Sequence, residues 1–125
     1  MKNYLTLVIL CASLFACKTP LQEYTFETIL WTATWSPDGQ YVASGGNSEV
    51  LTIWTSDTWK VAEQHSFPQT ITNTAWHPTQ PKLAVALQMA PKASAIIDME
   101  TKQKLELPGL SPEGARALGW SPDGQ

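Results

Sequence analysis

A tryptophan-proline corner returns three times along this chain at nearly even spacing. The copies are Trp35-Ser36-Pro37-Asp38-Gly39-Gln40, the degenerate Trp76-His77-Pro78-Thr79-Gln80, and Trp120-Ser121-Pro122-Asp123-Gly124-Gln125. The tryptophans are separated by 41 and then 44 residues. A period of about 40–45 residues is typical of a repeat that folds as one small four-stranded sheet. The spacing therefore predicts stacked, similar β-sheets.

Each corner has the chemistry of a tight turn between two strands. Pro37 presets the backbone for the second position of a type I turn, and Asp38 bonds to the local backbone. Gly39 takes the left-handed conformation that lets the chain reverse. Trp35 ends the preceding strand as a large apolar plate. The same structural roles are expected of Trp76, Pro78, Trp120, Pro122, Asp123 and Gly124.

Short apolar runs follow the first two corners. We expect strands at Tyr41–Gly46, Val50–Trp54, Trp59–Ala62, Leu83–Leu87, Ala95–Asp98 and Gln103–Leu107, and a last strand at Arg116–Trp120 before the third corner. Runs without alternation are typical of strands that are covered on both faces. A generic β-sandwich with two similar hairpins is the alternative, but the even spacing favours repeated sheets.

These corners and runs resemble the WD40-repeat family, with TolB-like propellers as a neighbouring family. The resemblance covers the chain from about Thr25 and implies an all-β propeller of four-stranded blades. Blade one spans about 25–66, blade two about 67–107, and the opening of a third about 108–125. Because a propeller closes with about 4–8 blades, we expect this sequence to be the front of a larger protein.

The chain departs from the family pattern at several positions. Trp54 is followed by Thr55 rather than aspartate, and Asp98 is preceded by Ile97 rather than tryptophan. The family's Gly-His pair is replaced by Phe26, Phe67 and Ser111. We therefore expect the hydrogen-bond network of a standard blade not to form, and packing to hold the blades instead.

The N-terminus has the pattern of a secretory signal. Lys2 precedes an apolar stretch of 13 residues from Tyr4 to Ala16, which is too short to span a bilayer stably. Leu14-Phe15-Ala16-Cys17 resembles a bacterial lipobox, which implies cleavage after Ala16 and lipidation of Cys17. The expected boundaries are a signal peptide at 1–16 and a tether at 17–24. An uncleaved anchor, or a secreted protein cut elsewhere, is the alternative.

The lipobox resemblance implies a lipoprotein of the bacterial envelope, anchored in a membrane. Lys18 after the cysteine is compatible with the outer membrane and periplasm of a Gram-negative cell. Cys11 would leave with the signal, so no disulfide and no cysteine-zinc site is expected.

Few residues indicate chemistry. His65 and His77 are the only histidines and lack the spacing of metal ligands, so we expect a surface role for His65 and a turn role for His77.

Charges are scattered without a basic run, which argues against nucleic-acid binding. Lys102 and Lys104 are expected on an outward strand face. Trp31 is interpreted, like Trp59, as additional packing, with an exposed ligand platform as the alternative.

We therefore expect a non-enzymatic, lipid-anchored propeller that serves as a protein-interaction or ligand-binding scaffold, without catalytic residues, cofactor or metal. One alternative is the accessory propeller domain of an exported hydrolase or peptidase whose catalytic part lies beyond residue 125. A partner-dependent assembly of half-propellers is the other.

Overall fold

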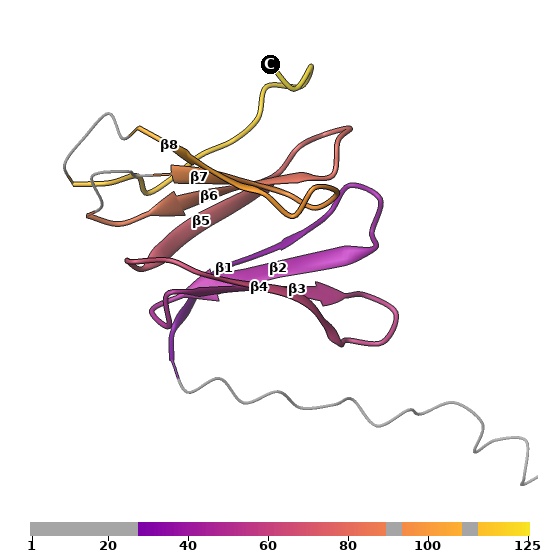
Figure 1. Cartoon of the computed structure of the whole chain (residues 1–125), viewed down its shortest axis with the longest axis horizontal. Helices are drawn as coiled ribbons and strands as arrows, with labels where there is room; N and C mark the ends of the chain where they lie inside the picture. The colour runs from indigo at the N-terminus through magenta and orange to yellow at the C-terminus, as the bar shows by residue number, and fades with distance from the viewer. Residues whose placement is uncertain (1–27, 90–93, 109–112) are drawn as a thin grey trace, which may run out of the picture.

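The computed structural model describes residues 28–89, 94–108 and 113–125. The expected signal peptide, the lipidation site Cys17 and the tether lie outside these residues. Two four-stranded antiparallel sheets form, each with its strands in chain order (Figure 1). The strands are β1 (Leu30–Trp35), β2 (Tyr41–Gly46), β3 (Val50–Thr55), β4 (Val61–Ser66), β5 (Ile71–Trp76), β6 (Lys82–Leu87), β7 (Ser94–Asp98) and β8 (Lys104–Leu107). The expected all-β fold with one sheet per repeat is confirmed.

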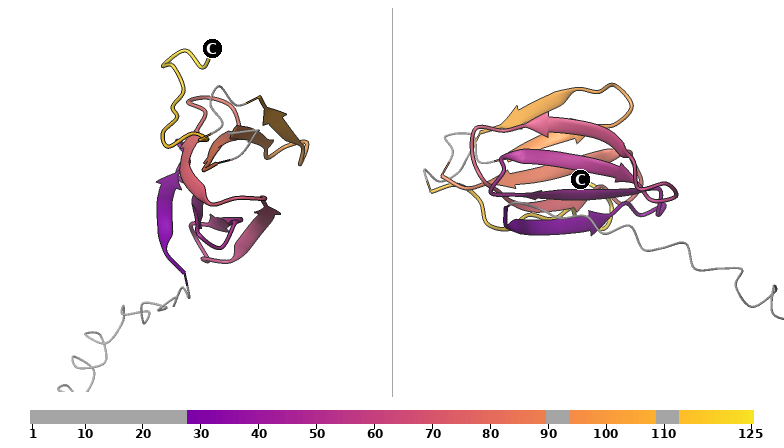
Figure 2. Two further views of the ribbon diagram at one scale, coloured as in Figure 1. Left: turned by 90° about the vertical axis from the view of Figure 1, so that its left-hand side faces the viewer. Right: turned by 90° about the horizontal axis from the view of Figure 1, so that it is seen from below.

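The two sheets stack face to face, with β5 against β1 and β2 (Figures 1 and 2). The largest fully buried side chains come from β3, β5, β6 and β7: Leu51, Ile53, Ile71, Leu83, Val85 and Ile97. β2 and β6 are buried along most of their length without alternation, because they are covered on both sides. Across the described residues, no helix has the length and apolarity that a bilayer crossing requires.

The first and third corners form the same turn. Gly39 has a φ of 73° and Gly124 a φ of 75°, a region that favours glycine. In each turn the glycine N–H donates to the serine carbonyl three residues earlier, at 2.9 Å. The degenerate corner has Gln80 at the matching position and closes differently, with the Lys82 N–H donating to the Gln80 carbonyl at 2.7 Å.

The third repeat departs from expectation beyond Gly114. Gly114 forms a bridge with Gln88, but Arg116 to Trp120, which were expected to be a strand, have no strand pairing. A strand exists only through hydrogen bonds to a neighbour. This segment instead runs along the second sheet, with the Ala115 N–H bonded to the Leu87 carbonyl just before it and the Trp120 indole bonded to the Ala75 carbonyl at its end (Figure 1).

The blade network forms in part, against expectation. The Trp54 indole N–H donates to the Ser44 hydroxyl at 2.9 Å, and that hydroxyl donates to the Thr52 carbonyl at 3.4 Å. In the second sheet, Ile97 takes the tryptophan position and is fully buried. The first blade thus combines hydrogen bonds with packing, whereas the second relies on packing at this position.

Candidate interaction surface at the strand bulges

β1 and β5 each carry a bulge at the same repeat position. Pairing of β1 with β2 skips Trp31, and pairing of β5 with β6 skips Thr72. Each extra residue lies four positions before its corner tryptophan, as does Arg116 in the third repeat. A bulge turns a side chain out of the regular alternation. These three residues and Gln88 line one hollow of about 150 Å³; with Asn47 they form what we term the bulge cluster.

Trp31 is held rigidly although it is exposed. Its indole N–H donates to the Asn47 Oδ1 at 2.6 Å, and 60% of the residue remains accessible to solvent. Within the described residues Trp31 is exposed and not packed between the two blades, which favours the alternative of an exposed platform. The bulge directs the ring away from the core, and Asn47 fixes its orientation.

Trp59 is partly consistent with packing. It lies in the turn before β4 with a φ of 54°, and its ring meets the Trp35 ring edge-on at 6.0 Å. The residue is still 42% exposed.

Neighbouring bonds place Arg116 beside Thr72. The Thr72 hydroxyl donates to the Ala115 carbonyl at 2.6 Å, and the Ala115 N–H donates to the Leu87 carbonyl at 2.9 Å. The backbone before Arg116 is thereby tied to both β5 and the end of β6. The guanidinium side chain is left exposed at the cluster.

The cluster brings an indole ring, a guanidinium, an amide and a hydroxyl together at the N-terminal ends of β1 and β5. Tryptophan and arginine are the residues most enriched in the energetic centres of protein interfaces. Within the described ranges, no three His, Cys, Asp or Glu side chains gather where they could hold a metal ion. Sequence reasoning missed Thr72 and Arg116 as partners of Trp31, although their shared offset from the corner could have indicated them.

The corner tryptophans link consecutive repeats. The Trp76 indole N–H donates to the Thr34 carbonyl at 3.1 Å, and the Trp120 indole N–H donates to the Ala75 carbonyl at 3.0 Å. Each acceptor immediately precedes the corner tryptophan of the previous repeat. Trp35, the first of the series, is 58% exposed.

The corner aspartates lie in their turns and stabilise them. Asp38 Oδ1 accepts the Ser36 hydroxyl at 2.6 Å and the Gln40 N–H at 3.0 Å. These bonds lower the pKa of Asp38, and the bond from the Ser36 hydroxyl has the largest effect. The equivalent bonds from Ser121 and Gln125 lower the pKa of Asp123. The remaining corner residues, Pro37, Gly39, Pro78, Pro122 and Gly124, shape the same turns.

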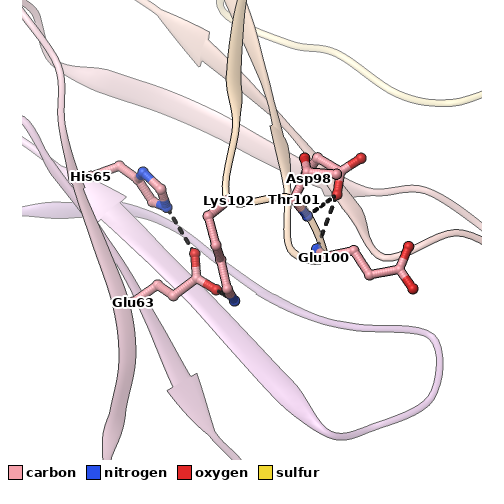
Figure 3. Close-up of polar contacts among 6 residues, drawn as sticks. All are labelled: Glu63, His65, Asp98, Glu100, Thr101 and Lys102. Atoms are coloured by element: carbon pink, nitrogen blue, oxygen red, sulfur yellow. Dashed lines mark hydrogen bonds and ion pairs between the residues drawn. The ribbon is translucent and has the colours of Figure 1, made fainter.

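Asp98 holds the β7–β8 turn. Its carboxylate accepts the N–H groups of Thr101 at 2.9 Å and Glu100 at 3.0 Å (Figure 3). These bonds, the Thr101 bond foremost, lower the pKa of Asp98, and the nearby Lys82 charge adds to the effect.

His77 caps the degenerate corner. Its Nδ1 accepts the N–H groups of Thr79 at 3.1 Å and Gln80 at 2.9 Å, so the ring proton is on Nε2. Nε2 then donates to the Gly124 carbonyl at 3.2 Å. The buried ring therefore joins the second corner to the third.

The outer edges of the two sheets are joined by charged groups. Glu63 on β4 contacts both the His65 ring, at 3.1 Å, and the Lys102 ammonium (Figure 3). Lys104 lies 4.9 Å from the centre of the Phe67 ring. Lys102 and Lys104 are both exposed, as expected of an outward face, but their ammonium groups also reach across to Glu63 and to the Ser66 carbonyl of the first sheet.

Comparisons with known proteins identify the fold. No protein-family profile matches the chain. Over 61 residues, 47% of this chain, it is 34% identical to the mouse WD repeat and HMG-box DNA-binding protein 1, of which it covers 6%. It is also similar to a chain in the crystal structure of the mitotic checkpoint complex, with a TM-score of 0.68 and 15% identity over 82% of this chain and 34% of that one. The two sheets are WD40-like propeller blades.

Proposed function

We propose that the protein is a non-enzymatic scaffold that binds a protein partner through the bulge cluster. The observation that carries this proposal is the exposed Trp31 ring, pinned by Asn47 beside Arg116. A preoriented aromatic residue loses little conformational freedom on binding. WD40 repeat domains are typically non-catalytic scaffolds, which agrees with this role but does not by itself define a site.

We further propose that a lipid on Cys17 anchors the blades to a bacterial envelope membrane, the outer membrane if the cell is Gram-negative. The support is the sequence of the first 17 residues, in which Lys2, the apolar stretch and the small Ala16 precede the cysteine. The tether of residues 17–24 would hold the interaction surface close to the membrane. Mass spectrometry of the N-terminal peptide should show acyl chains that Cys17→Ala abolishes; an unmodified Cys17 contradicts this proposal.

The interaction surface can be tested by site-specific photocrosslinking in the source cell. A benzoylphenylalanine at position 88, which lines the hollow and leaves Trp31 in place, should give one discrete adduct, which Trp31→Ala and Arg116→Ala each weaken at least fivefold. The same crosslinker at position 60, an exposed residue in the turn before β4, serves as the matched control and should not give this adduct. Equal adducts at positions 60 and 88, or none at position 88, would contradict binding at the bulge cluster.

A further inference from the structure

A second hollow lies at the other end of β1 and β5, between the first two corners. Its volume is about 370 Å³, within the usual range of ligand pockets. The lining residues of this corner pocket include Asp38, Tyr41, Trp76, His77, Pro81 and Met99. It is formed by both blades and is separate from the bulge cluster, which lies where β1 begins.

Two aromatic rings form a fixed wall of the corner pocket. The Tyr41 and Trp76 rings are nearly parallel, with an interplanar angle of 21° and centroids 6.3 Å apart. Trp76 is held by its bond to the Thr34 carbonyl, and the Tyr41 N–H donates to the Ser36 hydroxyl at 2.9 Å. Both rings also pack against the buried core. The wall is therefore formed before any ligand arrives.

The corner pocket has a negative charge. Asp38 is the one carboxylate among its described lining residues, which include no lysine or arginine, and the His77 Nδ1 accepts two backbone N–H groups. The bonds from Ser36 and Gln40 keep the Asp38 carboxylate ionised at neutral pH and both reach Oδ1. The second corner has Thr79 at the position that matches Asp38. Of the two corners that line the pocket, the first therefore supplies the carboxylate.

We propose that the corner pocket binds the guanidinium of an arginine side chain in a basic segment of a partner protein. A guanidinium is planar and weakly hydrated, stacks on aromatic faces and pairs with a carboxylate. The pocket supplies two aromatic rings and an ionised carboxylate, with no lysine or arginine among its described lining residues. This inference goes beyond the proposed function, because the corner pocket lies at the C-terminal ends of β1 and β5, whereas the bulge cluster lies at their N-terminal ends.

Peptide titration of the full-length protein tests the proposal without any mutation. The probes are acetyl-Ala-Arg-Ala-amide and its citrulline counterpart, which has nearly the same shape but no charge. The Trp76 indole N–H signal in NMR spectra should shift saturably with the arginine peptide, with a dissociation constant on the order of 1 mM. The citrulline peptide should bind at least tenfold more weakly. Equal affinities, or no saturable shift, overturn the proposal.

A matched pair of variants then tests the role of the carboxylate. Asp38→Asn keeps an oxygen for the Ser36 and Gln40 donors, whereas Asp123→Asn makes the same change in the identical third corner. Arginine-peptide affinity should fall at least tenfold in the first variant and less than twofold in the second. Equal losses in both variants overturn the assignment to Asp38. Crosslinking at position 88 reports on the bulge cluster, so the two proposals can fail independently.

Discussion

At the scale of single residues, the identical residues of the first and third corners form the same contacts. The serine hydroxyl donates to the aspartate at 2.6 Å in both the first and the third corner. Where serine is replaced by His77, the imidazole Nδ1 accepts turn N–H groups in its place. The corner thus tolerates substitution as long as one side chain satisfies its backbone donors.

Acid should weaken the fold through the turn aspartates. The pKa values of Asp38, Asp98 and Asp123 are lowered from 3.8 in the folded chain, so their contribution to stability is present above that pH and is lost as pH falls through the lower folded values. Thermal melting of the full-length protein should therefore show a falling Tm below about pH 4. In the variant with asparagine at positions 38, 98 and 123, the Tm should fall less steeply as the pH is lowered. An unchanged fall in Tm would contradict this assignment.

Replacing His77 by phenylalanine should destabilise the protein. His77 is only 3% exposed, and the change removes both the acceptor of the Thr79 and Gln80 N–H groups and the bond to the Gly124 carbonyl, at a cost of about 2 kcal/mol. His77→Asn should cost less, because a short amide oxygen can accept turn N–H groups. Urea unfolding measures both, with His65→Asn as a control; a phenylalanine variant as stable as the asparagine variant would refute the capping role.

At the scale of strands, hydroxyl groups join β1 to β5. The Thr74 hydroxyl lies 2.9 Å from those of both Thr32 and Thr34, and Thr32 and Thr74 are buried. With the corner tryptophan bonds, these contacts set how one blade seats on the next. A polar seam of this kind favours one relative placement over sliding of two apolar faces.

Valine substitutions should show that this seam acts as a unit. Thr74→Val alone leaves two hydroxyls without a partner and should cost about 1–2 kcal/mol. Changing Thr32, Thr34 and Thr74 together to valine should cost much less than three single losses combined, since no orphaned hydroxyl remains. Denaturant unfolding of the unmodified protein, the three single variants and the triple variant measures this coupling, and simple additivity would argue against it.

At the scale of the whole molecule, the first blade has an uncovered side. Trp35 is the counterpart of Trp76, which bonds to the previous blade, yet Trp35 remains 58% exposed. Ile29 is 61% exposed and Val61 49%. Because Trp76 uses the equivalent surface of the second blade to contact the first, the exposed surface around Trp35 is suited to packing against another blade.

A polypeptide limited to residues 18–125 should therefore fold poorly or associate. If an open blade face leaves roughly 400 Å² of apolar surface in water, the lost burial is on the order of 10 kcal/mol, comparable with the stability of a typical domain. Light scattering after size exclusion should reveal oligomers, or circular dichroism a broad melt. A monodisperse monomer that melts cooperatively would contradict this expectation.

The sequence by itself determined the repeat, the corner turns and the approximate extent of each strand. These features depend on local chemistry: proline and glycine preset the turns, and apolar runs mark strands covered on both sides. The missing strand at Arg116–Trp120 shows the limit, because a strand-like segment without a neighbour to pair with does not become a strand.

Only the tertiary structure decided which side chains meet. Trp31, Thr72 and Arg116 share no residue type, and the β-bulges and stacking of repeats bring them to one hollow. Lys102 likewise reaches Glu63 across 39 residues of sequence. Pairing register and blade stacking depend on contacts between distant segments, whereas turn chemistry and apolar spacing are local. The corners could therefore be predicted, but the candidate sites could not.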